Sequence, residues 1–260
     1  MRIAFINLDR ATERRAFMEA QGDKLGLAFE RVRAVEAGEI EEALAARLNG
    51  RWERPLTRAE LGCFLSHHAL WREVAEGREP MLVLEDDAIL SRQLPSALPS
   101  LTAFAGAEFL NLESFERQRF VARQASDLGT GLAVRRVFRD KSGSAAYLLW
   151  PAGARKLLAR AERGAAPVDA FLHGLSGLNA WQVEPALAIQ AHLWERRSGG
   201  TPIDAATSIQ APRGRLPLTL ANLPFRARRI ATQIRLAGQH IRRLGPATYR
   251  RTDLRDEDFR

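Results

Sequence analysis

The sequence is poor in cysteine and has no long apolar run. Cys63 is the single cysteine among 260 residues, so the chain cannot form an internal disulfide, and a reducing compartment is expected. No window holds the roughly 18 consecutive apolar residues that a membrane-spanning helix needs. The N-terminal stretch MRIAFINLDR reaches charged residues too early to provide the apolar core of a signal peptide. We therefore expect a cytoplasmic protein.

The sequence also lacks an acidic excess, and its basic excess is confined to one end. The chain has 39 Lys and Arg residues against 31 Asp and Glu residues, a formal net charge of +8. Residues 213–260 hold twelve arginines and four acidic residues, so this segment accounts for the whole surplus. The rest of the chain is neutral, and the tail's arginines are not interleaved with aromatic residues. This distribution argues against nucleic acid as a partner.

The apolar pattern predicts strands that alternate with helices. The predicted strands are 3–8, 29–35, 81–85, 107–112, 144–150 and 181–190. The predicted helices are 12–21, 39–48, 57–74 and 151–161, with a further helix starting at Asp169. Such alternation predicts an α/β fold, a sheet flanked by helices whose ligand site lies beyond the carboxyl ends of the strands. The pattern breaks after Arg196 in RRSGGTP, so we predict a domain at 1–210 and a tail at 211–260.

Local signals predict how three of these helices begin. Thr12 is the expected N-cap of the first helix. Thr57 and Glu60 have the spacing of a capping box, in which each side chain accepts from the backbone N–H of the other. Pro151 fits the first turn of its helix, where a missing N–H costs nothing.

Three carboxylates follow the apolar residues of MLVLEDDAIL, residues 81–90. Two like charges about 5 Å apart repel by about 3 kcal/mol at an effective dielectric constant near 20, so something should compensate them. In an extended strand Glu85 and Asp87 project to one face and Asp86 to the other. Two carboxylates on one face suit a hard divalent cation. A solvated turn is the alternative, and the triplet alone does not decide between them.

Four ordered blocks of the sequence resemble glycosyltransferase family 25, the bacterial lipopolysaccharide-type galactosyl- and glucosyltransferases related to collagen galactosyltransferases. FINLDRATER is similar to the family's I-N-L-x-R-x-x-x-R start, and LTRAELGCFLSHHALW to its G-E-x-G-C-x-x-S-H-x-x-x-W. MLVLEDDAIL resembles its strand ending in E-D-D, and GSAAYLLWPAGARKLL followed by PVD resembles its G-[ST]-x-x-Y and V-D segments. The resemblance covers about residues 1–210.

The resemblance implies a GT-A-like fold whose acidic motif holds Mn²⁺ or Mg²⁺ on the diphosphate of a UDP-sugar donor. The implied activity is inverting transfer of a hexose, galactose or glucose, to a hydroxyl of a bacterial cell-surface glycan such as lipopolysaccharide. Three departures from the pattern concern specificity: Ala59 replaces a glycine, AVEA at 34–37 replaces A-V-D-G, and His68 replaces an apolar residue. They leave a non-catalytic nucleotide-sugar- or glycan-binding homologue as the alternative.

The predicted metal ligands are Glu85 and Asp87, because strand alternation places both on one face. A metal ion there would act as a Lewis acid on the leaving diphosphate. Asp169 is the predicted general base, since it comes late in the sheet order and starts a helix; an ordinary helix N-cap is the alternative. The residues predicted to contact the nucleotide sugar are Asn7, Leu8, Arg10, Arg14, Ser66, His67 and Asp86.

The predicted nucleotide contacts also have structural alternatives. Ser66 and His67 lie within a helix, where a back-bonded serine and a packed histidine are common. Arg10 and Arg14 follow the first strand and could contact phosphate, or could form a solvated helix start. Cys63 is interpreted as a packing residue.

The tail carries an apolar stripe among its arginines. The stripe has spacings of 4, 3, 4 and 3 and consists of Ile230, Ile234, Ala237, Ile241 and Leu244. A basic amphipathic helix is typical of binding to an anionic membrane surface. We therefore expect residues 213–260 to bind the inner face of the cell membrane peripherally, which suits a lipid-linked glycan acceptor. Docking of the helix on the domain, or on a second subunit, is the alternative.

Overall fold

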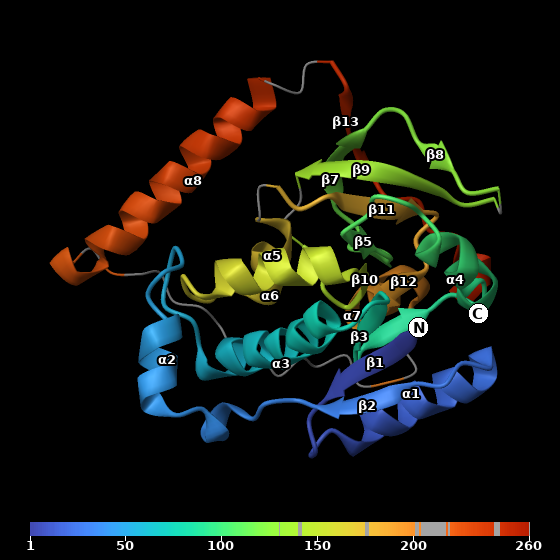
Figure 1. The fold of residues 1–260 in the computed structure, drawn as a ribbon, viewed down its shortest axis with the longest axis horizontal. Coiled ribbons are helices and arrows are strands. Elements are labelled where there is room, and N and C mark those ends of the chain that lie inside the picture. The colour runs from blue at the N-terminus through green and yellow to red at the C-terminus, as the bar shows by residue number, and fades with distance from the viewer. Residues whose placement is uncertain are drawn as a thin grey trace.

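The computed structural model describes residues 1–129, 131–139, 142–174, 177–200, 203, 217, 219–241 and 245–259, with the side chains at 139, 221 and 235–241 left out. A mixed sheet crosses the molecule, and helices cover both of its faces (Figure 1). The predicted α/β fold, a sheet flanked by helices, is therefore confirmed.

The main sheet has the strand order β13-β7-β9-β11-β5-β10-β3-β1-β2, with β8 beside β9. Strands β2, β1 and β3 are parallel, β10 is antiparallel to both β3 and β5, and β5 is parallel to β11. The strands are β1 (Arg2–Asn7), β2 (Glu30–Arg33), β3 (Met81–Glu85), β5 (Phe109–Asn111), β7 (Gln118–Ala122), β8 (Ser126–Asp127), β9 (Ala133–Arg139), β10 (Ala146–Leu149), β11 (Ala180–Glu184) and β13 (Ala247–Arg251).

A second, smaller sheet lies beyond the carboxyl ends of three main strands. It has the order β4-β12-β6 and consists of β4 (Ala88–Leu90), β6 (Glu113–Ser114) and β12 (Ala188–Gln190). Each of its strands follows a main strand along the chain: β4 follows β3, β6 follows β5 and β12 follows β11. Because β3, β5 and β11 run in the same direction, the small sheet extends one edge of the main sheet.

Apart from α7, which packs against the small sheet, the helices fall into two layers and an outer segment. The layer with α3 contains α2, α5 and α6, the opposite layer contains α1 and α4, and α8 runs along the outside (Figure 1). The helices are α1 (Thr12–Leu25), α2 (Glu42–Leu48), α3 (Arg58–Glu76), α4 (Leu94–Thr102), α5 (Pro151–Ala161), α6 (Val168–His173), α7 (Ala191–Ser198) and α8 (Leu223–Ile241), with short 3₁₀ turns at Ala37–Glu39, Leu220–Asn222 and Asp256–Phe259.

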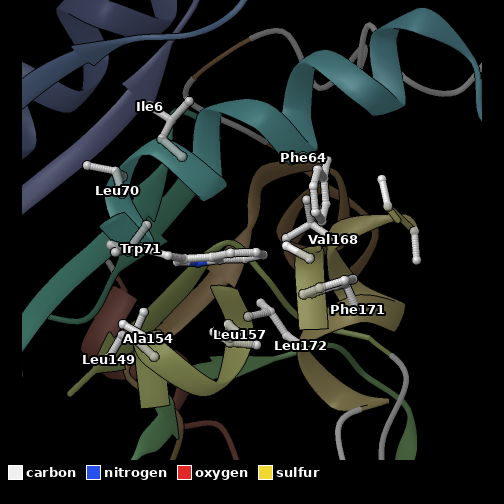
Figure 2. Packing of buried hydrophobic residues seen from close by; sticks show 14 of the residues in the cluster. Ile6, Phe64, Leu70, Trp71, Leu149, Ala154, Leu157, Val168, Phe171 and Leu172 are labelled. Carbon is white, nitrogen blue, oxygen red and sulfur yellow. The ribbon is translucent and has the colours of Figure 1, made fainter. Parts of the chain in front are cut away.

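Strand alternation divides the core between the two layers. On β3, Val83 packs toward the α3 layer, whereas Leu82 and Leu84 pack toward α1 and α4. Both faces of β3 are buried, which explains its unbroken apolar run. In the α3 layer, Trp71 stacks on Phe171 at 5.3 Å between ring centroids. Figure 2 shows side chains of α3 facing those of α5 and α6.

Two predicted helix starts are confirmed and one is wrong. Glu60 N–H donates to Thr57 Oγ1 at 3.1 Å, and Thr57 N–H donates to Glu60 Oε2 at 3.0 Å, so the capping box forms as predicted. Pro151 begins α5. Thr12, however, is the first helical residue and not the cap, because the N-cap position falls on Ala11, which offers no side-chain acceptor.

Two predicted segments are divided in the structure. The predicted helix at 39–48 becomes the 3₁₀ turn Ala37–Glu39 and α2. The predicted strand at 181–190 becomes β11 and β12, which belong to different sheets. Pro185 lies between these two strands, and it has no N–H to donate to a strand ladder.

The tail is partly helical and partly integrated into the main sheet. The predicted helix is present as α8, and β13 pairs antiparallel with β7 at the edge of the main sheet. The predicted domain boundary at 210–211 and the stripe residue Leu244 lie outside the described residues. Among the helices in the described ranges, none has the length and apolar character needed to cross a membrane.

The contact between α5 and β5 gives a prediction about stability. A Cβ atom on Gly153 would lie 2.2 Å from the backbone oxygen of Glu108, and backbone at the start of a buried strand has little room to move. We expect Gly153→Ala to lower the free energy of unfolding by about 1–3 kcal/mol, measured by urea denaturation. Gly200→Ala is the control, because no atom of the described residues lies within 4 Å of the added Cβ. Equal stability of both variants would contradict the packing argument.

Candidate active site

A pocket of about 590 Å³ opens at the carboxyl ends of β1, β2 and β3. Its wall includes residues from all four sequence blocks, among them Arg10, Cys63, Glu85 and Asp169. This position agrees with the prediction that the site lies at this edge of the sheet, beside the carboxylate triplet. A volume of several hundred cubic ångströms suits a small-molecule ligand.

The carboxylate triplet lies where β3 ends. Glu85 is the last residue of the strand, and Asp86 and Asp87 form the turn into β4. The prediction that Glu85 and Asp87 share a face assumed an extended strand, but the strand ends at Glu85, before the two aspartates. The turn, and not the strand, sets where Asp86 and Asp87 point.

Asp86 is held by the segment that follows β1. Its Oδ2 accepts from Asn7 Nδ2 at 2.8 Å, and its Oδ1 accepts from Arg14 at 3.0 Å. Asn7 is almost fully buried and also donates to Ala11 O at 3.0 Å. The structure thus places Asn7 behind the pocket, where it positions Asp86. Asn7 and Arg14 thus compensate part of the charge of Asp86, while burial still raises its pKa.

Asp87 is the carboxylate with least support. It is 6% exposed, and its Oδ1 has no hydrogen-bond partner among the described residues. Burial, with the negative charge of Glu85 adding to it, raises the pKa of Asp87 to about 7. A buried, unpartnered carboxylate oxygen that lines a pocket is well suited to bind a cation.

Glu85 is supported by two side chains. Ser144 Oγ lies 2.6 Å from its Oε1, and His67 Nε2 lies 3.3 Å from the same oxygen. Burial by itself would raise the pKa of Glu85, but hydrogen bonding from His67 and Ser144 outweighs burial and lowers it. Glu85 is therefore held in its charged form.

A chain of buried donors fixes the orientation of His67. Trp71 Nε1–H donates to Tyr147 Oη at 3.0 Å, and Tyr147 Oη lies 2.8 Å from His67 Nδ1. An indole can only donate, so the phenol proton of fully buried Tyr147 has His67 Nδ1 as its acceptor. The imidazole proton is then at Nε2, on the side of Glu85. His67 is thus both packed and directed at the site, which combines the two interpretations of this residue.

Cys63, His67 and Glu85 each place one possible ligand atom within 4.8 Å of the others. Burial, followed by the charge of Glu85, raises the pKa of the Cys63 thiol, and the proton of His67 is at Nε2. A soft metal ion would have to displace both protons, so we assign none here. Cys63 nevertheless lines the pocket, a role that the packing interpretation did not include.

Ser144 links the carboxylate triplet to Asp169. Its Oγ lies 2.6 Å from Glu85 Oε1 and 2.5 Å from Asp169 Oδ1. A hydroxyl has one proton, so Ser144 donates to only one of the two carboxylates at a time. The three groups form one proton-sharing unit. The sequence analysis placed Ser144 in a block but gave it no role, because a serine in a loop carries no chemical signal by itself.

Asp169 lies in the first turn of α6 and lines the pocket. The N-cap of α6 is Pro167, so the alternative interpretation of Asp169 as the capping residue does not hold. Its carboxylate instead accepts from Ser144 at the floor of the site.

The loop that carries Ser144 is held by side chains that follow or end β5. Gly143 has φ of 103°, and a Cβ there would lie 2.8 Å from Asn111 Nδ2. Asn111 Nδ2 donates to Gly143 O at 3.2 Å, and Ala145 N–H donates to Glu113 Oε2 at 2.9 Å. Burial raises the pKa of Glu113 well above its ordinary value, and the charge of Asp169 adds to this. Gly143 is therefore required by the backbone conformation and by lack of space.

The remaining predicted contacts line the wall between β1 and α3. Leu8 and Arg10 face the pocket, and Arg10 forms an ion pair with Glu36 across its mouth. Ser66 Oγ accepts from Val35 N–H at 2.8 Å and donates to the backbone oxygen of Gly62 at 2.7 Å. Ser66 is thus a back-bonded serine that also anchors the loop after β2.

The opposite wall consists of residues that the sequence analysis did not single out. They are Phe115, Arg117, Gln190 and His192. Two of them follow β6, and the other two lie at the junction of β12 and α7. Strands of two or three residues are too short to show a period, so no sequence signal pointed to this wall.

The buried donor chain gives a prediction that uses both tyrosines of the protein. Tyr147→Phe leaves Trp71 Nε1–H and His67 Nδ1 without their partner in a fully buried place, which costs about 1–3 kcal/mol for each group left unpaired. We expect a corresponding loss in the free energy of unfolding. We also expect ¹⁵N NMR to show His67 protonated at Nε2 in the wild type and mixed tautomers in the variant.

Tyr249→Phe is the matched control, because Tyr249 is 53% exposed and lies away from the pocket lining. It should change neither measurement. Protonation of His67 at Nδ1 in the wild type would contradict the assigned direction of the chain.

Comparison with known proteins supports the resemblance found in the sequence. The sequence model of glycosyltransferase family 25, described as an LPS biosynthesis protein, matches residues 1–172. Procollagen galactosyltransferase 1-B of Xenopus laevis is 30% identical over 220 residues, which are 73% of this chain and 36% of the relative. Inactive glycosyltransferase 25 family member 3 of Homo sapiens is 35% identical over 146 residues, 55% of this chain and 24% of the relative.

A glycosyltransferase 25 family member of Anopheles gambiae is 39% identical over 95 residues, 33% of this chain and 16% of the relative. The chain thus spans from about a sixth to about a third of the length of these relatives. The segment matched by the family model includes the triplet, the donor chain through Tyr147 and the Ser144–Asp169 contact. From this match over most of its length, the chain belongs to glycosyltransferase family 25.

Proposed function

We propose that this protein is a metal-dependent, inverting glycosyltransferase that moves a hexose, galactose or glucose, from a UDP-sugar to a hydroxyl group of a bacterial cell-surface glycan such as lipopolysaccharide. One observation carries the proposal. Glu85 and Asp87 line the same pocket as Asp169, and Ser144 bridges Glu85 to Asp169. Two carboxylates that can bind a cation and a candidate general base thus face one cavity. Transfer of a sugar from a diphosphate needs both: a cation for the leaving diphosphate and a base for the acceptor hydroxyl.

The residues of the triplet fit a hard divalent cation, Mn²⁺ or Mg²⁺. Glu85 is held in its charged form, and Asp87 Oδ1 is buried without a partner among the described residues. We propose these two carboxylates as the ligands, with Asp86 beside them toward the donor. A bound cation would stabilise the negative charge that develops on the leaving diphosphate.

Asp169 is the proposed general base. It takes the proton of the acceptor hydroxyl while that oxygen forms a bond to the anomeric carbon of the donor sugar. The bond from this carbon to the diphosphate oxygen breaks, and its electron pair leaves with UDP. Ser144 lies between Asp169 and Glu85, so the proposed base is next to the carboxylate triplet. A single displacement of this kind inverts the anomeric configuration.

The wall between β1 and α3 is the proposed donor side. Leu8 offers an apolar surface, and Arg10 lies at the mouth with its guanidinium paired to Glu36. Arg14 acts through Asp86. Gly62 lets α3 approach the loop after β2, since a Cβ there would lie 2.6 Å from Val35 O. In this proposal Ser66 and His67 shape the donor side. Ser66 Oγ does not contact the ligand, because it bonds to the backbone of Val35 and Gly62.

A non-catalytic homologue is the second candidate, and one observation favours it. The human relative reported above bears the name of an inactive family member. Release of UDP from a UDP-hexose in the presence of Mn²⁺ separates the two candidates, because a binding protein would hold the donor without turnover.

We further propose that the tail places the enzyme at the inner face of the cell membrane, in the cytoplasm, near a lipid-linked acceptor. On α8, Ile230 is 60% exposed and Ile234 is 67% exposed. Arg228 donates to the backbone oxygens of Gly50 and Trp52, which ties α8 to the body of the molecule. Ile230 and Ile234 therefore face solvent, and α8 runs along the outside of the molecule (Figure 1).

The fit of Asp87 to a cation predicts opposite effects on stability and activity. Asp87→Asn removes a buried carboxylate whose Oδ1 lacks a partner among the described residues, so the metal-free variant should unfold at a higher temperature than the metal-free wild type at pH 8. Because the folded-state pKa is raised from 3.8 to about 7, the carboxylate destabilises the fold increasingly as pH rises through this range. The difference should therefore shrink at pH 5.

Asp87→Asn should also abolish the increase in melting temperature caused by Mn²⁺, and it should lower UDP release from UDP-galactose or UDP-glucose at least tenfold, about 1.4 kcal/mol or more of barrier. Asp23→Asn, which changes an exposed carboxylate on α1, is the control. Retention of Mn²⁺ stabilisation in Asp87→Asn would contradict the proposed ligand. No UDP release by the wild type with any nucleotide sugar would favour the non-catalytic candidate.

The exposed stripe predicts membrane binding that depends on α8. The double variant Ile230→Ser and Ile234→Ser should float less with liposomes that contain anionic phosphatidylglycerol than the wild type does. Phe138→Ser is the matched control, since Phe138 is 41% exposed on β9. The full chain is kept, because deleting the tail would remove β13 from the main sheet. Equal flotation of wild type and double variant would exclude the membrane role.

A further inference from the structure

The small sheet brings three parts of the chain to one edge of the pocket. On β12, Gln190 pairs with Ala88 of β4, and Ile189 pairs with Ser114 of β6. Strand β4 is antiparallel to β12, so its first residue lies at the same edge as the carboxyl ends of β12 and β6. Asp87, which precedes β4, is therefore next to the residues that follow β12 and β6. Ala191 N–H donates to Asp87 O at 2.9 Å, which confirms this closeness.

The segment after β6 has an unusual backbone that is held in place. Glu116 has φ of 54°, a conformation that costs energy for a residue with a Cβ. Its carboxylate pairs with Arg197 at 3.1 Å and with Arg251 at 4.0 Å. These ion pairs direct Glu116 away from the pocket, while its neighbours Phe115 and Arg117 both line it. Strain that the surrounding structure maintains in this way is common at binding sites.

The side chains on this wall combine an apolar ring with polar groups. Phe115 is half-buried against the apolar cluster of the small sheet, and the His192 ring lies 6.4 Å from it. Burial, with the charge of Arg196 adding to it, lowers the pKa of His192, so its imidazole is neutral at pH 7. Gln190 adds an amide at the edge of the wall. A ring face beside neutral hydrogen-bonding groups suits the C–H face and hydroxyl groups of a sugar.

Arg117 adds a cation that forms no ion pair within the described part of the chain. Its guanidinium lies over the Phe115 ring, with the guanidinium carbon 5.4 Å from the ring centre, and none of the ion pairs among the described residues includes it. The two arginines on the donor side differ, since Arg10 pairs with Glu36 and Arg14 with Asp86. An exposed guanidinium beside a sugar-binding ring would pair with an anionic group on that sugar.

We infer that Phe115, Arg117, Gln190 and His192 form the acceptor subsite, and that they take a saccharide with an anionic substituent, phosphate or carboxylate. The sugar ring packs against Phe115 next to the guanidinium, and the anion pairs with Arg117. This inference rests on the proposed function, because it assumes that the opposite wall holds the UDP-sugar.

The test measures sugar binding to the full chain with its donor side occupied. Saturating UDP and Mn²⁺ are added first, and glucose 6-phosphate, glucuronate and glucose are then titrated separately by ligand-observed NMR. We expect at least one of the two anionic sugars to bind about tenfold more tightly than glucose. Preference for glucose 6-phosphate identifies phosphate as the anion, and preference for glucuronate identifies carboxylate.

The variants separate the two parts of the subsite. Arg117→Gln should reduce binding of the anionic sugar about tenfold, to the level of glucose, and leave UDP affinity unchanged. Phe115→Leu keeps the apolar packing but removes the ring face, so it should weaken all three sugars. Arg155→Gln, at an exposed position on α5, is the matched control and should change none of them.

Equal binding of all three sugars to the wild type, or unchanged binding in Arg117→Gln, overturns the inference. Weaker UDP binding in Arg117→Gln also overturns it, because Arg117 would then belong to the donor side. Failure of the wild type to bind UDP with Mn²⁺ is a different result, and it counts against the proposed function itself.

Discussion

Three adjacent carboxylates lie at the end of a buried strand, and most of the side chains around the site serve to stabilise their negative charges. A carboxylate removed from water is stable only where charge or hydrogen bonds replace its hydration. Asp86 receives both from Arg14 and Asn7. Glu85 accepts a hydrogen bond from Ser144 Oγ, and His67 Nε2 lies 3.3 Å from the same carboxylate oxygen. Asp87 Oδ1 has no such partner among the described residues, which makes the triplet incomplete as an all-protein arrangement and suited to a cation.

The support of Glu85 reaches far into the core. His67 is oriented by Tyr147, and Tyr147 in turn accepts from Trp71. Trp71 stacks on Phe171 of α6, the helix whose first turn carries Asp169. The packing of α3 against α6, visible in Figure 2, therefore fixes both sides of the proton-sharing unit at once. In this part of the molecule the packing of the core therefore determines the geometry of the site.

Elements with strong local signals could be predicted from the sequence. The buried run of β3, the capping box of α3 and the proline start of α5 each depend on residues close together in the chain, and all three are present. Thr12 shows the limit of this reasoning, because a good capping residue was displaced by one position. The small sheet could not be predicted, since β4, β6 and β12 are too short to show a period and are stabilised by pairing between distant segments.

The sequence alone determined the carboxylate triplet, its place after a buried strand and the family of the chain, because these depend on residue type and order. The roles within the site were decided by the tertiary structure. In the tertiary structure Asp86 forms an ion pair with Arg14, and His67 is directed toward Glu85. Ser144 lies between Glu85 and Asp169. The tertiary structure also brings Phe115 and Arg117 to the opposite wall. Such contacts join residues many positions apart, and only the packing of strands and helices determines which of them meet.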